Sequence, residues 1–251
     1  MKKVSAKKHF GQHFLNEPSI AENIVNQLEF KNKNLLEIGP GMGILTQFLY
    51  NKNINLKVIE IDVESIFYLR LNYPKLNIIE GDFIELDLEE VTKSKLSLIG
   101  NFPYNISSQI LFKVFENRDK ITEVVGMFQK EVAERIVSTQ GKKKGILSIF
   151  LQAFYKIDYC FSVNEDVFTP PPKVKSGVLK LIRNDRKELD CDEKKFIQVV
   201  KAGYNQRRKT LKNALKAFSL NSSPEVEELF KKRAEELDVE DFITLTKNVK
   251  K

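Results

Sequence analysis

The residues with the clearest chemical potential begin with a glycine-rich loop, Gly39-Pro40-Gly41-Met42-Gly43, between an apolar run and a helical pattern. Glycines let the backbone turn tightly and approach a ligand without a Cβ in the way, and the following helix N-terminus offers free N–H donors. An acid closes each of the next two apolar runs: Glu60, 19 residues after Gly41, and Asp82. Carboxylates in such positions accept hydrogen bonds from ribose hydroxyls, and Asp82 suits an adenine amino group. The constellation predicts a site for an adenosine-containing cofactor.

The glycine spacing distinguishes two classes of cofactor. A dinucleotide site has the pattern Gly-x-Gly-x-x-Gly, and Ile44 occupies the position of its third glycine. A nicotinamide cofactor is therefore disfavoured. A glycine loop with acids after two successive strands favours S-adenosylmethionine, and the alternative is a structural turn that binds no ligand.

A second constellation is the tetrapeptide Asn101-Phe102-Pro103-Tyr104, which follows the fourth apolar run. The exocyclic amine of adenine is a poor nucleophile, because its lone pair is delocalised into the ring. Asn101 Oδ1 and the carbonyl of Phe102 or Pro103 can accept its two N–H groups, which directs the lone pair at a methyl donor and stabilises the developing charge. Pro103 fixes the local φ angle, and Tyr104 offers a face for stacking the base. The tetrapeptide predicts methylation of an adenine amine; the alternative is a plain Asn-Pro turn.

These residues need a scaffold that brings strand ends together, and the first part of the chain alternates apolar runs with helical patterns. The expected strands are 35–38, 58–61, 76–79, 96–99 and 124–128, closed by 155–163 and 177–182. The expected helices are 20–28, 44–50, 63–71, 107–115, 131–137 and 146–154. This alternation predicts an α/β fold with a Rossmann-like, doubly wound parallel sheet. Ligands bind at the carboxyl ends of such strands.

The pattern changes near Arg183. A charged segment without apolar periodicity follows, and after it come only helical patterns, at 193–204, 207–218, 224–237 and 240–249. Pro224, after Asn221-Ser222-Ser223, is a good signal for the first turn of a helix. We therefore predict an S-adenosylmethionine-dependent methyltransferase domain over residues 1–184. A small all-helical, RNA-binding domain is expected over residues 185–251.

The chain is basic, with 41 Lys and Arg against 34 Asp and Glu, a formal net charge of +7. Basic residues without intervening acids gather in residues 1–16, in 142–144 and in 201–221. In the last cluster a helix would present three cations on one face, Arg208, Lys212 and Lys216. Segregated positive charge indicates a nucleic acid as partner, although each cluster alone is typical of a solvated surface.

Other features exclude several classes of protein. Cys160 and Cys191 fit no metal-ligand spacing and indicate reduced thiols. No apolar run reaches the roughly 18 residues that a membrane span needs, and residues 1–13 are polar and basic, unlike a secretory signal. We expect a cytoplasmic protein with no metal and no membrane segment. We also expect a monomer, although no feature of the sequence decides it.

Together these motifs resemble the KsgA/RsmA family of 16S ribosomal RNA adenine dimethyltransferases along nearly the whole chain. The matching segments are 10–16, 37–43, 58–60, 81–82, 101–107, 129–132, 168–174 and 205–211. The resemblance implies transfer of methyl groups from S-adenosylmethionine to N6 of two adjacent adenines in a hairpin loop near the 3′ end of the rRNA. Each adenine receives two methyls. The N-terminal segment folds over the cofactor, whose implied contacts are His13, Leu15, Gly39, Glu60, Asp82 and Asn101.

Two residues depart from the family pattern. His13 stands where Asn is common. A backbone contact tolerates that change and a specific amide contact does not, and the chemistry requires no acid or base at His13. Phe102 stands where Leu or Ile is usual, and we expect this change of volume to be tolerated.

The substrate adenine must leave its stack to reach a methyl donor. Phe168, which precedes a triple proline, is expected to cover the face of the adenine opposite Tyr104. Arg207, Arg208 and Lys209 are expected to hold RNA phosphates.

Three alternative functions are open to such a sequence. A large-subunit rRNA methyltransferase that confers macrolide resistance shares the cofactor domain, but residues 205–211 and the triple proline favour the small-subunit type. A nucleic-acid-binding protein with a relict cofactor fold is disfavoured by the intact Gly39, Glu60, Asp82 and Asn101. An NAD oxidoreductase is disfavoured by Ile44.

Overall fold

The computed structural model describes residues 4–221 and 223–250, and it divides the chain into two compact units. The first unit runs to Ala133 and resumes with Ile157–Arg183. The second unit comprises Glu134–Lys156 and the chain from Asn184 onward.

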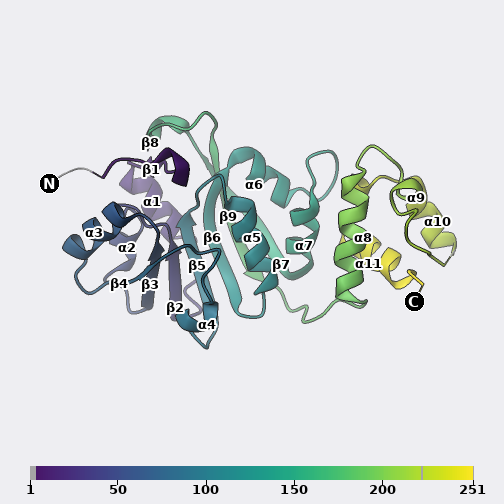
Figure 1. The fold of residues 1–251 in the computed structure, drawn as a ribbon, viewed down its shortest axis with the longest axis horizontal. Coiled ribbons are helices and arrows are strands. Elements are labelled where there is room, and N and C mark those ends of the chain that lie inside the picture. Colours follow the sequence, from purple (N-terminus) through teal and green to yellow (C-terminus); the bar gives the residue numbers. More distant parts are fainter. Residues whose placement is uncertain (1–3, 222, 251) are drawn as a thin grey trace. The chain divides into compact units, whose positions relative to one another are not determined.

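A seven-stranded sheet organises the first unit, with the strand order β4-β3-β2-β5-β6-β9-β7 (Figure 1). Its strands are β2 (Asn34–Ile38), β3 (Asn55–Glu60), β4 (Asn77–Glu80), β5 (Leu96–Asn101), β6 (Ile121–Gln129), β7 (Tyr155–Val163) and β9 (Ser176–Arg183). The strands from β4 to β6 are parallel, and β9 is antiparallel to β6. The predicted Rossmann-like α/β fold is confirmed. Leu35, Leu36, Leu98 and Ile99 are almost fully buried, because strands covered on both faces need continuous apolar side chains.

Short helices and loops connect these strands. They are α1 (Pro18–Val25), α2 (Thr46–Leu49), α3 (Val63–Asn72), α4 (Leu88–Val91) and α5 (Ser107–Glu116), followed by α6 (Lys130–Val137), which crosses the boundary between the units. The side chain of Asp62 caps α3, and that of Asp87 caps α4. The predicted helix at 44–50 is shorter in the structure, because the glycine loop continues as turns up to Leu45.

The N-terminal residues fold back on the first unit. We call residues 4–16 the arm; it contains a 3₁₀ turn, η1 (Lys8–Phe10), and β1 (Phe14–Leu15). β1 pairs with β8 (Phe168–Thr169), which follows the 3₁₀ turn η2 (Glu165–Val167). The pairing places Phe14 opposite Thr169 and Leu15 opposite Phe168.

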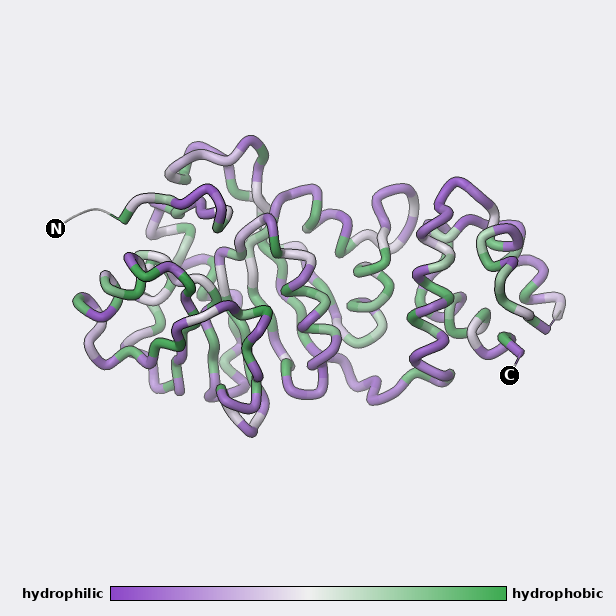
Figure 2. Tube along the Cα trace, viewed as in Figure 1, coloured by the Kyte–Doolittle hydropathy of each residue, from purple (hydrophilic) through white to green (hydrophobic). Residues whose placement is uncertain are grey.

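The second unit is helical. Its elements are α7 (Ile146–Phe154), α8 (Glu193–Asn205), α9 (Leu211–Ala214), α10 (Pro224–Lys231), η3 (Ala234–Glu236) and α11 (Val239–Lys247). Figure 2 shows α7 as mostly hydrophobic, and its Phe150 ring lies 6.2 Å from that of Phe196 in α8. The predicted boundary at 184/185 had left residues 134–156 in the first domain. The structure groups them with the helical unit, because α7 buries its apolar side chains there.

Two predicted helices of this unit are wrong in extent. The helix expected at 207–218 is reduced to α9, because residues 206–209 form a turn and Thr210 is extended, with ψ 155°. Arg208, Lys212 and Lys216 therefore do not share a helix face. The helix expected at 224–237 breaks after Lys231, where Lys232 and Arg233 are extended. Its predicted start is confirmed, with Pro224 in the first turn and Ser223 as the cap.

Across residues 4–221 and 223–250, none of the helices combines the length and the apolar character that crossing a membrane requires. The same residues contain no group of three His, Cys, Asp or Glu side chains that could hold a metal ion.

Candidate active site

A cavity of about 270 Å³ opens at the carboxyl edge of the sheet. Four neighbouring strands lead into its wall. Gly39 and Gly41 follow β2, Glu60 ends β3, Asp82 follows β4 and Asn101 ends β5. The arm supplies the rest of the wall with residues 9–14, and Pro103 and Tyr104 also line the cavity. The structure thus brings together the glycine loop, the two acids and the tetrapeptide, because parallel strands end at one edge of a sheet.

The glycine loop needs glycine for two reasons. Gly39 and Gly41 have φ angles of 64° and 57°, in the left-handed region that other residues rarely adopt. A Cβ on Gly41 would lie 2.8 Å from the ring of Phe14 in the arm, whereas a Cβ on Gly39 would meet nothing within 4 Å. Gly41 therefore allows the arm to approach, and Gly39 keeps backbone exposed to the cavity.

Glu60 is 4% exposed, and backbone N–H groups hold its carboxylate. Oε1 accepts from the N–H groups of Ile61 and Asp62, both at 2.9 Å, and Oε2 accepts from that of Gly41 at 3.0 Å. Burial raises the pKa of Glu60, and the three backbone hydrogen bonds oppose this shift. The carboxylate is fixed in place and still lines the cavity.

The loop after β4 is fixed by a lysine from α5. Asp82 Oδ1 accepts from the N–H of Ile84 at 2.8 Å. Lys113 Nζ donates to the carbonyls of Phe83 and Ile84, each at 2.8 Å, and to that of Leu86 at 2.5 Å. Phe83 lines the cavity beside Asp82. No sequence motif predicted a role for Lys113 or Phe83.

The tetrapeptide is oriented by contacts on both sides. Asn101 Nδ2 donates to the backbone carbonyl of His13 at 2.9 Å, which leaves Oδ1 as the acceptor of this amide. The Tyr104 hydroxyl lies 2.5 Å from Ser176 Oγ, and its ring stacks on the His13 imidazole with 5.5 Å between centroids. Burial raises the pKa of Tyr104, so this phenol stays protonated. His13 contacts Asn101 through its backbone carbonyl. A His at position 13, where Asn is common, therefore leaves this contact intact.

Phe102 fills space that two glycines provide. Its ring is 1% exposed and packs against Phe128, with 5.0 Å between centroids. A Cβ on Gly126 would lie 2.2 Å from this ring, and one on Gly100 would lie 2.6 Å from it. The larger side chain at position 102 is therefore accommodated, and it anchors the tetrapeptide in the core.

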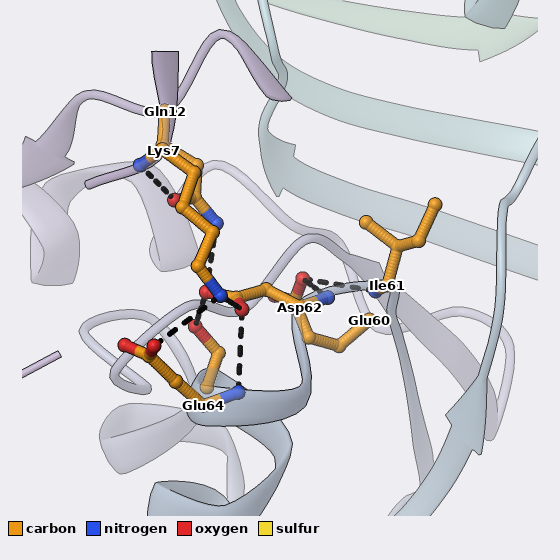
Figure 3. A network of polar contacts seen from close by, with 7 residues as sticks. Lys7, Gln12, Glu60, Ile61, Asp62 and Glu64 are labelled. Atoms are coloured by element: carbon orange, nitrogen blue, oxygen red, sulfur yellow. Dashed lines mark hydrogen bonds and ion pairs between the residues drawn. The ribbon is translucent and has the colours of Figure 1, made fainter. Parts of the chain in front are cut away.

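The arm is held over the cavity by Asp62, a residue that the sequence analysis did not single out (Figure 3). Asp62 is buried, forms an ion pair with Lys7 and accepts from Gln12 Nε2 at 3.3 Å. Gln12 Oε1 in turn accepts from the N–H of Lys7 at 2.8 Å. Burial raises the pKa of Asp62, but the hydrogen bonds from Lys7, Gln12, the Glu64 N–H and Ser65 together hold that pKa below its usual value. The cap position was readable from sequence, but its partners 50 and 55 residues away were not.

A second contact fixes the other end of the arm. His13 Nδ1 lies 2.7 Å from the carbonyl of Pro170, and Asn16 Nδ2 donates to Thr169 Oγ1 at 2.7 Å. His13 thus joins the arm to the segment after β8. This position gives His13 a structural role.

The structure contradicts the prediction for Phe168. Its side chain is 2% exposed and belongs to the core cluster that contains Leu15 and Val163. Phe168 pairs with Leu15 between β8 and β1, and it is not among the residues that line the cavity. Leu15 is also buried, and it borders a small adjoining cavity together with Glu37, Gly39 and Asn101.

Glu37 lies beneath the glycine loop. Its side chain is 1% exposed, and Oε2 accepts from Thr46 Oγ1 at 2.7 Å. Burial raises the pKa of Glu37 to about 8. This carboxyl is therefore largely protonated at neutral pH.

The predicted phosphate-binding residues lie in the helical unit, in the turn between α8 and α9. Arg208 and Lys209 are exposed. Arg207 donates to the carbonyl of Lys142 and lies 3.3 Å from Glu235 Oε2. The three cations are thus adjacent, although they do not stand on a helix as expected.

The strand order, with one antiparallel strand after five parallel ones, and the cavity at the strand ends define a Rossmann-like methyltransferase. Residues 3–251 match the model of the family described as ribosomal RNA adenine dimethylase. The chain belongs to this family. It is therefore an rRNA adenine dimethyltransferase, the activity that its motifs predict.

Individual relatives agree with this assignment. The chain is 56% identical to the ribosomal RNA small subunit methyltransferase A of Cytophaga hutchinsonii over 252 residues, which cover 98% of each protein. It is 54% identical to the protein of that name from Flavobacterium johnsoniae, over 99% of this chain and 97% of the other. Membership in the family excludes the NAD oxidoreductase alternative.

Two solved structures have a similar fold. A dimethyladenosine transferase from Plasmodium falciparum aligns with a TM-score of 0.78 and 28% identity, over 93% of this chain and 96% of the other. The 23S rRNA methyltransferase ErmE aligns with a TM-score of 0.74 and 20% identity, over 94% of this chain and 99% of the other. At that identity the likeness to ErmE concerns the fold alone.

Proposed function

We propose that this enzyme transfers methyl groups from S-adenosylmethionine to N6 of two adjacent adenines in the 3′-terminal hairpin loop of 16S rRNA during maturation of the small subunit. The observation that carries this proposal is one cavity lined by Glu60, Asp82 and the glycine loop on one side and by Asn101, Pro103 and Tyr104 on the other. The rRNA is the partner, as the small subunit or its precursor. The site of action is the cytoplasm, and the enzyme acts as a monomer.

The cavity fits the proposed cofactor. Cβ atoms on Gly39 and Gly81 would meet no protein atom within 4 Å, so both stretches of backbone face open space. Glu60 offers a buried, fixed carboxylate for ribose hydroxyls, and Asp82 offers an acceptor for the adenine amine. His13 and Leu15 would close the cavity from the arm, and Gly41 admits that arm. When bound, the cofactor supplies an electrophilic methyl group.

The tetrapeptide would activate the substrate amine. Asn101 Oδ1 and the carbonyl of Phe102 or Pro103 accept the two N6–H groups and hold the nitrogen lone pair toward the methyl carbon. They also stabilise the positive charge that develops as the N–C bond forms, because fixed dipoles need no reorganisation. N6 then loses its proton to water, so no side chain with a pKa near 7 is required.

The base must be removed from its stack, and Tyr104 would receive it. The His13 imidazole already covers one face of the Tyr104 ring, so we assign the opposite face to the adenine. Arg207, Arg208 and Lys209 would hold phosphates of the same rRNA.

Transfer of label from S-adenosylmethionine to isolated ribosomal subunits tests which rRNA is the substrate. We expect label in dimethyladenosine of 30S subunits that lack the modification and none in 50S subunits. Label in 50S subunits alone would assign the chain to the large-subunit type. RNA binding without any transfer would assign it to the relict binding proteins.

Asn101→Ala tests the mechanism. Loss of the only side-chain acceptor assigned to the amine should lower kcat by about 10²-fold or more. Binding of 30S subunits should remain close to wild type, because the phosphate contacts are unchanged. Wild-type kcat in this variant would refute the assigned role of Asn101, and single-turnover kinetics with saturating cofactor measure it directly.

A further inference from the structure

The helical unit contains a cavity that the adenine chemistry does not use. It is open, has a volume of about 700 Å³, and lies where α8 ends and the loop before α7 approaches η3. We call it the basic cavity. Its lining residues include Lys142, Tyr204, Arg207, Arg208, Arg233 and Glu235. The volume is in the range of small-molecule sites and is far larger than one phosphate group needs.

Tyr204 carries a polar group with no evident structural use. Its side chain is 6% exposed, and its ring stacks on Phe242 with 6.0 Å between centroids. Within the part of the chain that the structure describes, the buried hydroxyl has no hydrogen-bond partner. An unpaired buried hydroxyl lowers stability, and a phenylalanine would pack on Phe242 equally well. The hydroxyl is therefore best explained by a ligand.

Charge in the basic cavity differs with exposure. Lys142, Arg208 and Arg233 are exposed at its rim, whereas the Glu235 side chain is only 14% exposed. Burial raises the pKa of the Tyr204 phenol, Arg207 lowers it and Glu235 raises it further, so both charges act on the hydroxyl. The exposed charged residues of the lining are therefore cations, whereas the Glu235 carboxylate and the Tyr204 hydroxyl are less exposed polar groups of the lining.

This order disfavours a bare phosphate near Glu235, although the exposed cations can hold one. A phosphate that approached the Glu235 carboxylate would be repelled. A ligand with an anionic group at one end and N–H donors at the other pairs with both the cations and Glu235. Glu235 has one partner among the described side chains, Arg207 at 3.3 Å, and retains lone pairs for further donors.

We propose that the basic cavity binds one unstacked nucleotide of the rRNA, with its phosphate at the exposed cations and the polar edge of its base at Glu235 and the Tyr204 hydroxyl. The proposal rests on the proposed rRNA substrate and adds a second point of recognition in the helical unit. Proteins read RNA largely through such splayed-out bases, whose edges become available for hydrogen bonding.

Two substitutions separate this proposal from a simple phosphate contact. Tyr204→Phe removes only the hydroxyl, and we expect it to weaken binding of unmodified 30S subunits by about 3- to 10-fold. The melting temperature of the free protein should stay equal or rise, because the unpaired group is gone. Glu235→Gln removes a negative charge and should nevertheless weaken binding, because the base donates to this carboxylate. A phosphate-only contact predicts the opposite, tighter binding by Glu235→Gln.

Filter binding at one salt concentration measures the affinity for 30S subunits. Thermal unfolding measures the melting temperature of each variant. Tyr50→Phe is the matched control, since Tyr50 lies in the first unit and its hydroxyl accepts from the N–H of Lys75 at 3.0 Å. We expect wild-type 30S affinity in this control.

Three outcomes would overturn the proposal. Tighter binding by Glu235→Gln would reduce the basic cavity to a phosphate contact. If Tyr204→Phe binds 30S subunits with wild-type affinity while Arg208→Ala binds them more weakly, the basic cavity does not bind a nucleotide base. The proposed function would be unaffected by that result. Failure of the wild-type enzyme itself to bind and methylate 30S subunits would refute the proposed function as well.

Discussion

Individual residues around the cavity owe their properties to burial. Glu60 and Glu37 are both buried acids on neighbouring strands, β3 and β2, yet their surroundings differ. Three backbone N–H groups stabilise the charge of Glu60. The hydrogen bonds to Glu37 come from one residue, Thr46, and Glu37 Oε1 has no partner among the described residues. Glu60 is suited to bind hydroxyls as a carboxylate, and Glu37 is suited to remain neutral beneath the loop.

Glu37 makes stability depend on pH. Its pKa is about 8 in the folded protein against 4.5 for an unperturbed carboxyl. The folded state thus binds more protons, so the contribution of Glu37 is fully present below pH 4.5 and is lost as the pH rises through 8. We expect the free energy of unfolding of the wild type to fall over this range relative to Glu37→Gln, measured by urea denaturation. Parallel pH profiles for the two proteins would contradict the assignment.

At the scale of elements, the arm is the segment whose position matters most to the site. Lys7 and Gln12 hold it at Asp62 (Figure 3). At its other end, His13 holds it at the carbonyl of Pro170. Asp62 follows Glu60 by two residues, and its N–H donates to the Glu60 carboxylate. The same turn therefore contacts both the arm and the Glu60 carboxylate, which we propose as the acceptor for the cofactor ribose.

Lys7→Met tests whether this contact with the arm also supports cofactor binding. The substitution keeps the aliphatic stem and removes the ion pair with Asp62, which lowers the population of the closed arm. We expect the affinity for S-adenosylmethionine, measured by equilibrium dialysis without RNA, to fall by about 3- to 10-fold. Lys8→Met is the control, because Lys8 is the next residue of the arm and is exposed. Equal affinities for both variants would show that the ion pair does not hold the arm.

At the scale of the whole molecule, the net charge of +7 is unevenly distributed. Several of the cations are neutralised within the protein: Lys7 pairs with Asp62, Lys120 with Glu89 and Lys143 with Glu134. Arg208 and Lys209, in contrast, are exposed beside the basic cavity. Each such pair cancels one positive and one negative charge and leaves the net charge of +7 unchanged. Exposed cations such as Arg208 and Lys209 are therefore where this excess can meet RNA phosphates.

The salt dependence of 30S binding measures such contacts with phosphates. Each phosphate neutralised contributes about 0.7 to 0.9 to the slope of log K against log salt concentration. Arg208→Ala should therefore reduce the slope by about one and weaken binding. Lys231→Ala is a suitable control, because Lys231 already pairs with Glu228 on α10. An unchanged slope in Arg208→Ala would exclude a phosphate contact at this residue.

Local patterns in the sequence were sufficient for the sheet, for most helices of the first unit and for the meeting of Gly39, Glu60, Asp82 and Asn101 at one edge. Alternating apolar runs specify strands, and the ends of parallel strands are necessarily neighbours. The helix expected at 207–218 was wrong because Thr210 is extended by contacts of Leu211 with Lys232, 21 residues further on. Periodicity carries no information about such a contact.

The sequence by itself therefore determined the family, the fold and the residues at the strand ends, since these depend on local pattern and chain order. Only the tertiary structure decided that Phe168 is a core residue, that Asp62 holds the arm, and that Tyr204 and Glu235 share the basic cavity. Each of these depends on side chains that are distant in sequence and adjacent in space, and their burial and pairing are set by packing alone.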